Sequence, residues 1–143
     1  MCFIISEPDL APKIAEKDII CYKCLKSAKR PNKIILKSPL INYTYKLKKL
    51  NKNVNLKINP PYNSYQGSYF FIDKGYHSYI TETFYYVDTY ICIIPKGSIY
   101  YQNLDINRYL SNQIVILCKK TWINNLITKF KIRFNIPLKY EKN

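Results

Sequence analysis

The sequence predicts an α+β domain: a mostly antiparallel β-sheet of roughly six to eight short strands, with a C-terminal amphipathic helix packed on one face. Hydrophobic residues make up 48% of the 143 residues, which is enough for one core. Short runs of β-branched and aromatic residues, bounded by Pro, Asn or Gly, are typical of strands. We therefore expect a single domain with an N-terminal arm (1–17), a β-rich core (18–118) and a basic helix and tail (119–143).

The first half of the core is predicted to form two strands followed by a hairpin. Residues 18–26 and 33–37 are rich in Ile, and the polar stretch 27–32 between them indicates a turn. Residues 42–58 alternate between apolar and polar side chains, as half-buried strands do. Because Asn tolerates positive φ, the hairpin turn is expected at 51–53. This hairpin would present a basic outer face made of Lys46, Lys48 and Lys57.

The second half of the core predicts four further short strands. Apolar and aromatic runs place them at 68–73, 90–94, 98–102 and 113–118. The third of these is expected at a sheet edge, and the polar residues 103–112 after it are expected to be irregular. A turn at Pro95-Lys96-Gly97 is expected to end the second, because Pro and Gly interrupt strands.

Residues 121–131 are predicted to form a helix. Thr121 is a suitable N-cap, and basic residues near the other end suit the negative pole of the helix dipole. The apolar residues form one stripe along this helix, which we expect to pack against the sheet: Trp122, Ile123, Leu126, Ile127 and Phe130.

The net charge of +14 points to an anionic partner. Lys outnumbers Arg by 20 to 3, so AT-rich coding offers an alternative explanation for the lysines, although it does not explain the shortage of acids. The acids are unevenly placed, since none occurs from Ile19 to Ile72 or from Ile106 to Tyr140. Blocks of one sign raise the local potential and attract polyanions such as DNA or RNA.

Ten basic residues are the predicted nucleic-acid contacts. Their expected role is to neutralise phosphates without reading bases, so binding should weaken steeply with salt. Five belong to the predicted hairpin, namely Lys46, Lys48, Lys49, Lys52 and Lys57. Five surround the predicted helix, namely Lys119, Lys120, Lys129, Lys131 and Arg133.

The cysteines predict neither a metal site nor a cofactor. Cys21 and Cys24 form a C-x-x-C pair inside a strand-like run, so their side chains would point to opposite faces. No second pair of this kind follows. Five cysteines and no signal peptide indicate reduced thiols, and the longest apolar runs are too short to span a bilayer. We expect a cytosolic compartment and no membrane partner.

The single histidine, His77, is the natural candidate for proton transfer, but nothing in its spacing selects a nucleophile or an acid. A structural, hydrogen-bonded role is the simpler interpretation, and the protein is expected to be non-catalytic. An alternative is an enzyme or nucleotide-binding protein in which His77, Tyr22, Lys96 and Ser98 line one pocket. Lys96 and Ser98 would then hold a phosphate in the Pro95–Ser98 turn.

Tyrosine is unusually frequent, and ten of the fifteen tyrosines lie between Tyr62 and Tyr101. Many are expected to form cross-strand pairs. Tyr62 and Tyr65 lie in a polar loop and are harder to bury, so they suit a ligand or partner surface. This supports a second alternative: a protein–protein module, such as a virion component or an inhibitor of a host factor.

Several short motifs resemble a small domain of tailed phages and large DNA viruses. They are Lys74-Gly-Tyr-His-Ser78, Cys92-Ile-Ile-Pro-Lys-Gly-Ser98 with Tyr100-Tyr101, and Ser111-Asn-Gln-Ile-Val-Ile116. The resemblance spans residues 18–118 and departs at Lys48-Lys49, where a glycine turn is expected, and in the basic helix after Cys118. It implies a small viral accessory or virion-associated protein, located in a host cytoplasm or a virion. It transfers no catalytic residue, since that domain has no established activity.

Overall fold

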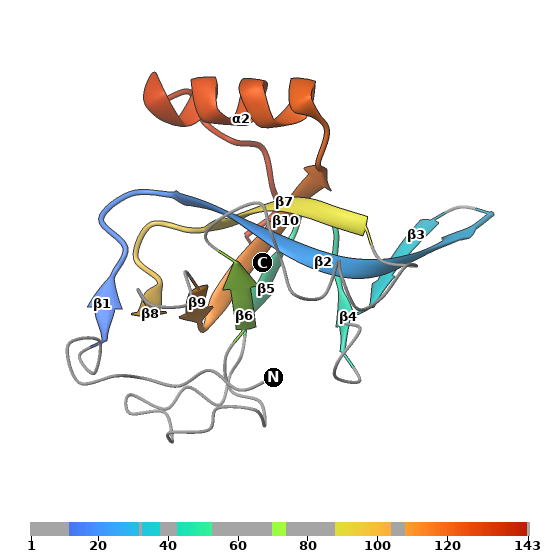
Figure 1. Cartoon of the computed structure of the whole chain (residues 1–143), viewed down its shortest axis with the longest axis horizontal. Coiled ribbons are helices and arrows are strands. Elements are labelled where there is room, and N and C mark those ends of the chain that lie inside the picture. Colours follow the sequence, from blue (N-terminus) through green and yellow to red (C-terminus); the bar gives the residue numbers. More distant parts are fainter. Residues whose placement is uncertain are drawn as a thin grey trace.

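The computed structural model describes residues 12–31, 33–37, 43–52, 70–73, 88–103 and 108–142. These residues form a ten-stranded sheet and a C-terminal helix, which confirms the predicted α+β class and gives more strands than expected (Figure 1). The elements are β1 (Lys13–Ile14), β2 (Ile19–Arg30), β3 (Lys33–Lys37), β4 (Thr44–Tyr45), β5 (Leu50–Lys52), β6 (Phe70–Asp73), β7 (Asp88–Ile94), β8 (Ile99–Asn103), β9 (Arg108–Ser111), β10 (Gln113–Lys119) and α2 (Trp122–Arg133).

The strands are arranged in the order β1-β8-β9-β6-β2-β7-β10-β5, and β3 pairs with both β2 and β4 outside this path. Every ladder between named strands is antiparallel. The long strand β2 therefore holds the sheet together, because it pairs with β7, β6 and β3 along its length.

The core lies on both faces of the central strands β2, β7 and β10. Alternate residues of β7 point to opposite faces, with Cys92 and Ile94 in one buried cluster and Ile91 and Ile93 in the other. The second cluster is covered by Ile132, Leu138 and Tyr140 from the end of α2 and the tail after it. Burial on both faces explains why β7 and β10 read as continuous apolar runs.

The turn of the hairpin predicted over 42–58 was placed wrongly. Positive φ falls at Lys48 (54°), whereas Asn51, expected in the turn, lies in β5 and pairs with β10. The buried Asn51 amide accepts a hydrogen bond from the Lys46 backbone N–H (2.9 Å) and donates to the carbonyl oxygens of Lys46 (3.0 Å) and Lys49 (3.1 Å). These bonds tie together the loop before β5. Residues 53–58 lie outside the described part of the chain.

Two predicted irregular stretches are partly strand. β2 continues to Arg30 through most of the predicted turn at 27–32, and the chain turns at Pro31. Within the predicted irregular stretch 103–112, β9 joins β8 to β6. The predicted edge strand is also wrong as an edge, because β8 pairs with β1 on its other side.

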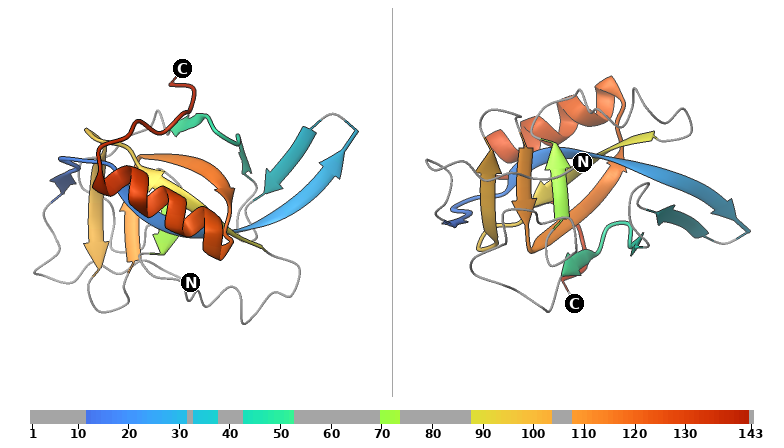
Figure 2. Two further views of the ribbon diagram at one scale, coloured as in Figure 1. Left: turned by 90° about the horizontal axis from the view of Figure 1, so that it is seen from above. Right: turned by 60° about the horizontal axis from the view of Figure 1, so that its bottom comes forward.

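The predicted helix is confirmed, but its expected packing is wrong. Thr121 caps it, since its Oγ1 accepts a hydrogen bond from the Asn124 N–H at 3.1 Å. The apolar stripe faces away from the sheet, with Trp122 77% exposed and Leu126 62% exposed. Figure 2 (left) shows α2 lying across one face of the sheet.

Polar side chains hold α2 in this orientation. The Tyr22 hydroxyl donates a 2.6 Å hydrogen bond to Asn125 Oδ1, and the Asn124 side chain donates to the Lys119 carbonyl oxygen at 3.0 Å. Thr128 is the buried residue of the helix. The sequence periodicity located a stripe, but these contacts decide which side of the helix meets the sheet. In the described part of the chain, no helix is long and apolar enough to cross a membrane.

Candidate nucleic-acid interface

The second half of β2 leaves the body of the sheet and pairs with β3. β2 stays paired with β7 as far as Leu25, and from Lys26 to Arg30 its partner is β3. We call this two-stranded unit, residues 26–30 and 33–37, the basic ribbon. Figures 1 and 2 show it projecting beyond the rest of the sheet.

The register of the basic ribbon places like charges opposite one another. Lys26 pairs with Lys37 and Arg30 pairs with Lys33, with Ala28 and Ile35 paired between them. Because alternate positions of a strand share a face, all four basic positions belong to one face of the ribbon. The register therefore concentrates basic residues on one face of the ribbon.

The opposite face of the ribbon anchors it to the core. Leu36 is fully buried in the same cluster as Leu25, and it pairs with Tyr45 of β4. The Lys23 ammonium lies 5.3 Å from the centre of the Tyr45 ring. Burial raises the pKa of Tyr45 well above its usual value, so its hydroxyl stays neutral. The base of the ribbon is therefore fixed to the core through this face.

A second basic feature adjoins the ribbon through β4. A hollow of about 210 Å³ is lined by Tyr43, Lys46, Leu50, Asn51, Lys52 and Lys142, and none of these described residues carries a carboxylate side chain. Tyr43 lies close to the ribbon, because the next residue, Thr44, pairs with Lys37. Its ring meets the Tyr45 ring edge-on at 4.6 Å, and burial raises its pKa. We call this the lysine hollow.

The predicted contacts near the hairpin lie in several settings. Lys46 and Lys52 line the lysine hollow. Lys48 is exposed, and Lys49 forms an ion pair with Glu141 at 3.4 Å. Lys57 lies outside the described residues. Two of the four described lysines are thus placed to share one anion.

The predicted contacts around α2 are less uniform. Lys119 forms an ion pair with Asp88 at 3.3 Å, and the Lys120 ammonium lies 5.8 Å from the centre of the Tyr22 ring. Lys129 and Arg133 are exposed on the helix, and Lys131 is half-buried. The helix therefore contributes cations of its own, at some distance in the fold from the basic ribbon.

Cys118, near the end of β10, lies within electrostatic range of one lysine from each acid-free block. Burial raises the pKa of its thiol, while the positive charges of Lys48 and Lys131 act to lower it. Lys48 precedes β5 and Lys131 lies in α2.

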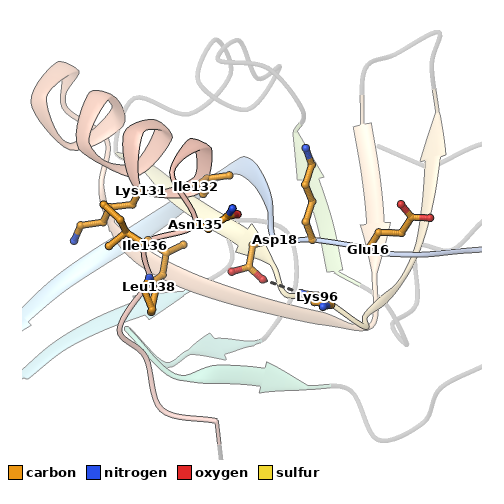
Figure 3. Close-up of a pocket in the computed structure, with 10 residues that line it drawn as sticks. Glu16, Asp18, Lys96, Lys131, Ile132, Asn135, Ile136 and Leu138 are labelled. Atoms are coloured by element: carbon orange, nitrogen blue, oxygen red, sulfur yellow. Dashed lines mark hydrogen bonds between the residues drawn. The ribbon is translucent and has the colours of Figure 1, made fainter.

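The alternative pocket around His77 is only partly described, because His77 itself lies outside the described residues. Lys96 lines a hollow of about 310 Å³ between the turn before β2 and the end of α2 (Figure 3). Its backbone N–H donates to Asp18 Oδ1 at 2.8 Å. Tyr22 and Ser98 do not line this hollow; Tyr22 contacts α2 instead, and Ser98 is buried. The hollow mixes Glu16 and Asp18 with three lysines, so it is a poor site for a polyanion.

The cysteines lie as the strand prediction requires. Cys21 pairs in register with Cys92 and Cys24 with Thr89, and both buried thiols are reduced rather than joined in a disulfide. Burial raises the pKa of Cys92, which makes it an unreactive core residue. Among the described residues, no group of three or more His, Cys, Asp and Glu side chains could hold a metal ion.

The basic ribbon was missed by sequence reasoning. Because residues 27–32 were predicted to form a polar turn, the pairing of residues 27–30 with β3 was not expected. One signal was present: Lys26 and Arg30 before Pro31 mirror Lys33 and Lys37 after it at matched spacing. A tight turn at this proline brings these positions into register.

No protein-family model, curated protein or solved structure matches this chain. The function of the interface therefore has to be inferred from its own residues.

Proposed function

We propose that this protein binds nucleic acid, DNA or RNA, without catalysis, through the basic ribbon and the lysine hollow. The observation that carries the proposal is the ribbon register, which opposes Lys26 to Lys37 and Arg30 to Lys33 on one face. A phosphate backbone laid along this face would meet four basic positions, which suits a chain of anions.

The dimensions of the ribbon suit this role. Lys26 and Arg30 are four residues apart along β2, which is roughly 13 Å in a strand. Phosphates of one DNA strand follow each other at about 3.4 Å along the axis, so the ribbon spans several of them. A two-stranded ribbon is also narrow enough for the major groove of B-DNA, which is about 12 Å wide.

The lysine hollow supplies a second contact. Lys46, Lys52 and Lys142 line it, none of its described lining residues has a carboxylate side chain, and the Tyr43 ring offers a surface against which a base can stack. Since β4 links the hollow directly to β3, one strand of nucleic acid can reach both features. The resulting contacts are mainly to phosphate, so little sequence preference is expected.

The test is fluorescence anisotropy with a labelled DNA duplex over a salt series. Each phosphate neutralised contributes about −0.9 to the slope of log affinity against log salt. Removing two ribbon charges in Lys26→Gln/Lys37→Gln is expected to weaken binding and to reduce the steepness of the slope by about 1.8. Single-stranded DNA and RNA probes then rank the preferred form.

The matched control is Lys13→Gln/Lys17→Gln. It removes the same charge from the β1 end of the sheet, away from the basic ribbon (Figure 1). It should bind nearly as the unaltered protein does. Equal losses in the two variants would mean that net charge alone drives binding, and an absence of binding at low salt would reject the proposal.

The viral setting stays a prediction that rests on the resemblance in residues 18–118, as does a location in a host cytoplasm or virion. The alternative protein–protein module uses Tyr62 and Tyr65, which lie outside the described residues. It predicts a complex that survives nuclease treatment, whereas nucleic-acid binding through the basic ribbon does not.

A further inference from the structure

The outward side of α2 is an apolar surface. Its residues are exposed, and we call them the apolar helix face: Trp122, Ile123, Leu126, Ile127, Phe130 and Phe134. At 3.6 residues per turn, those within the helix cover an arc of roughly 140°. An ordinary surface helix buries such an arc, so this face is suited to an apolar environment outside the described fold.

The orientation is fixed by specific contacts. Tyr22 donates a hydrogen bond to Asn125, the Asn124 side chain donates to the Lys119 carbonyl oxygen at 3.0 Å, and Ile132 packs on the core. Turning the helix over to bury Trp122 would break the Tyr22 bond and expose Ile132. The apolar helix face is thus presented by the fold.

Cations border this face, and the segment from Ile106 to Tyr140 contains no acid. On the helical wheel, Lys129 and Arg133 fall on the Trp122 side of the arc and Lys131 falls beyond Ile127. The occupant must therefore be apolar with a negative border.

We propose that α2 lies on the surface of an anionic lipid bilayer, with the apolar helix face in the region between headgroups and acyl chains. Helices of this kind combine Trp, Phe and Leu on one side with Lys and Arg at the border, and bind through both. The sequence predicted no membrane partner because no segment can span a bilayer. A twelve-residue helix, about 18 Å long, is too short to span one but can lie flat on it.

Charge argues against a second copy of this chain as the occupant. Two helices pairing through this face would bring together two molecules of net charge +14, with Lys129 and Arg133 of both copies at one interface. The phosphate groups of anionic lipids instead complement these cations.

The chain contains a single tryptophan, so Trp122 reports on this face directly. With vesicles of phosphatidylcholine and phosphatidylglycerol, its emission is expected to shift to the blue and the protein to co-sediment. With phosphatidylcholine alone, both effects should be weak, and high salt should reduce them. Equal binding to the two kinds of vesicle would overturn the charge argument.

Two variants separate this proposal from nucleic-acid binding. Leu126→Gln/Phe130→Gln alters exposed residues, so the protein should fold, bind DNA normally and lose vesicle binding. Lys26→Gln/Lys37→Gln should do the opposite. Vesicle binding that survives Leu126→Gln/Phe130→Gln would overturn the proposal. So would a blue-shifted Trp122 emission in buffer, because another part of the chain or a second copy would then already cover the face.

Discussion

The two halves of β2 have opposite surroundings within one continuous strand. Ile19–Leu25 pairs with β7 in the middle of the sheet, and Cys21 and Leu25 are fully buried. Residues 26–30 pair only with β3, and most of their described side chains are exposed. A single strand thus serves first as core and then as one side of the basic ribbon.

The first half of β2 contributes to the stability of the fold, and we infer that the second half contributes to binding. In the first half, side chains are selected by packing against β7 and β10, since a buried methylene group contributes about 0.8 kcal/mol. In the second half, Lys26 and Arg30 oppose basic partners, which costs stability. We therefore interpret residues 26–30 as the half of β2 that contacts a partner.

The largest expected effect is in the first half. Leu25→Ala should destabilise the protein by about 2–5 kcal/mol, because it leaves a cavity beside Leu36 in a fully buried cluster. Urea unfolding followed by circular dichroism measures this. Lys29→Ala, four residues further along the same strand and exposed, should change the free energy of unfolding by less than about 0.5 kcal/mol. Similar losses in the two variants would remove the distinction between the halves.

A smaller effect of opposite sign is expected in the second half. Lys37→Glu replaces a like-charge pair with Lys26 by an opposite-charge pair. It should stabilise the protein by about 0.2–1 kcal/mol at low salt, and less at high salt. The same variant should weaken DNA binding, since it places a carboxylate among the phosphate contacts. Lys37→Gln is the control, with a smaller change in both measurements.

Joint loss of stability and binding in Lys37→Glu would contradict this account, because the binding defect would then follow from unfolding. A gain in stability with unchanged binding would place the nucleic-acid contact elsewhere.

Much of the fold could be predicted because burial leaves a clear pattern. β3, β7 and β10 follow from apolar runs bounded by turn residues, and α2 follows from its period and its Thr121 cap. The direction of α2 could not be predicted. Its stripe is apolar, and an apolar stripe normally indicates the buried side, whereas here Tyr22 and Asn125 turn it outward.

The candidate interface was only half visible in the sequence. The acid-free block from Ile19 to Ile72 indicated a polyanion partner, and Lys46 and Lys52 were predicted contacts. Their shared hollow depends on Asn51, because its side-chain amide hydrogen-bonds to the backbone N–H and carbonyl oxygen of Lys46. The pattern predicted a turn at 51–53, whereas the positive φ lies at Lys48. The opposed lysines of the ribbon require the register of β2 and β3, which depends on the exact turn at Pro31.

Nucleic-acid binding through the basic ribbon is tested most directly by titrating the ¹⁵N-labelled protein with a short DNA duplex and following the amide chemical shifts. The largest shift changes are expected in residues 26–30 and 33–37, with smaller ones at Tyr43, Lys46 and Lys52, and almost none in β1. Changes concentrated on α2 or β1, with the basic ribbon unaffected, would contradict it.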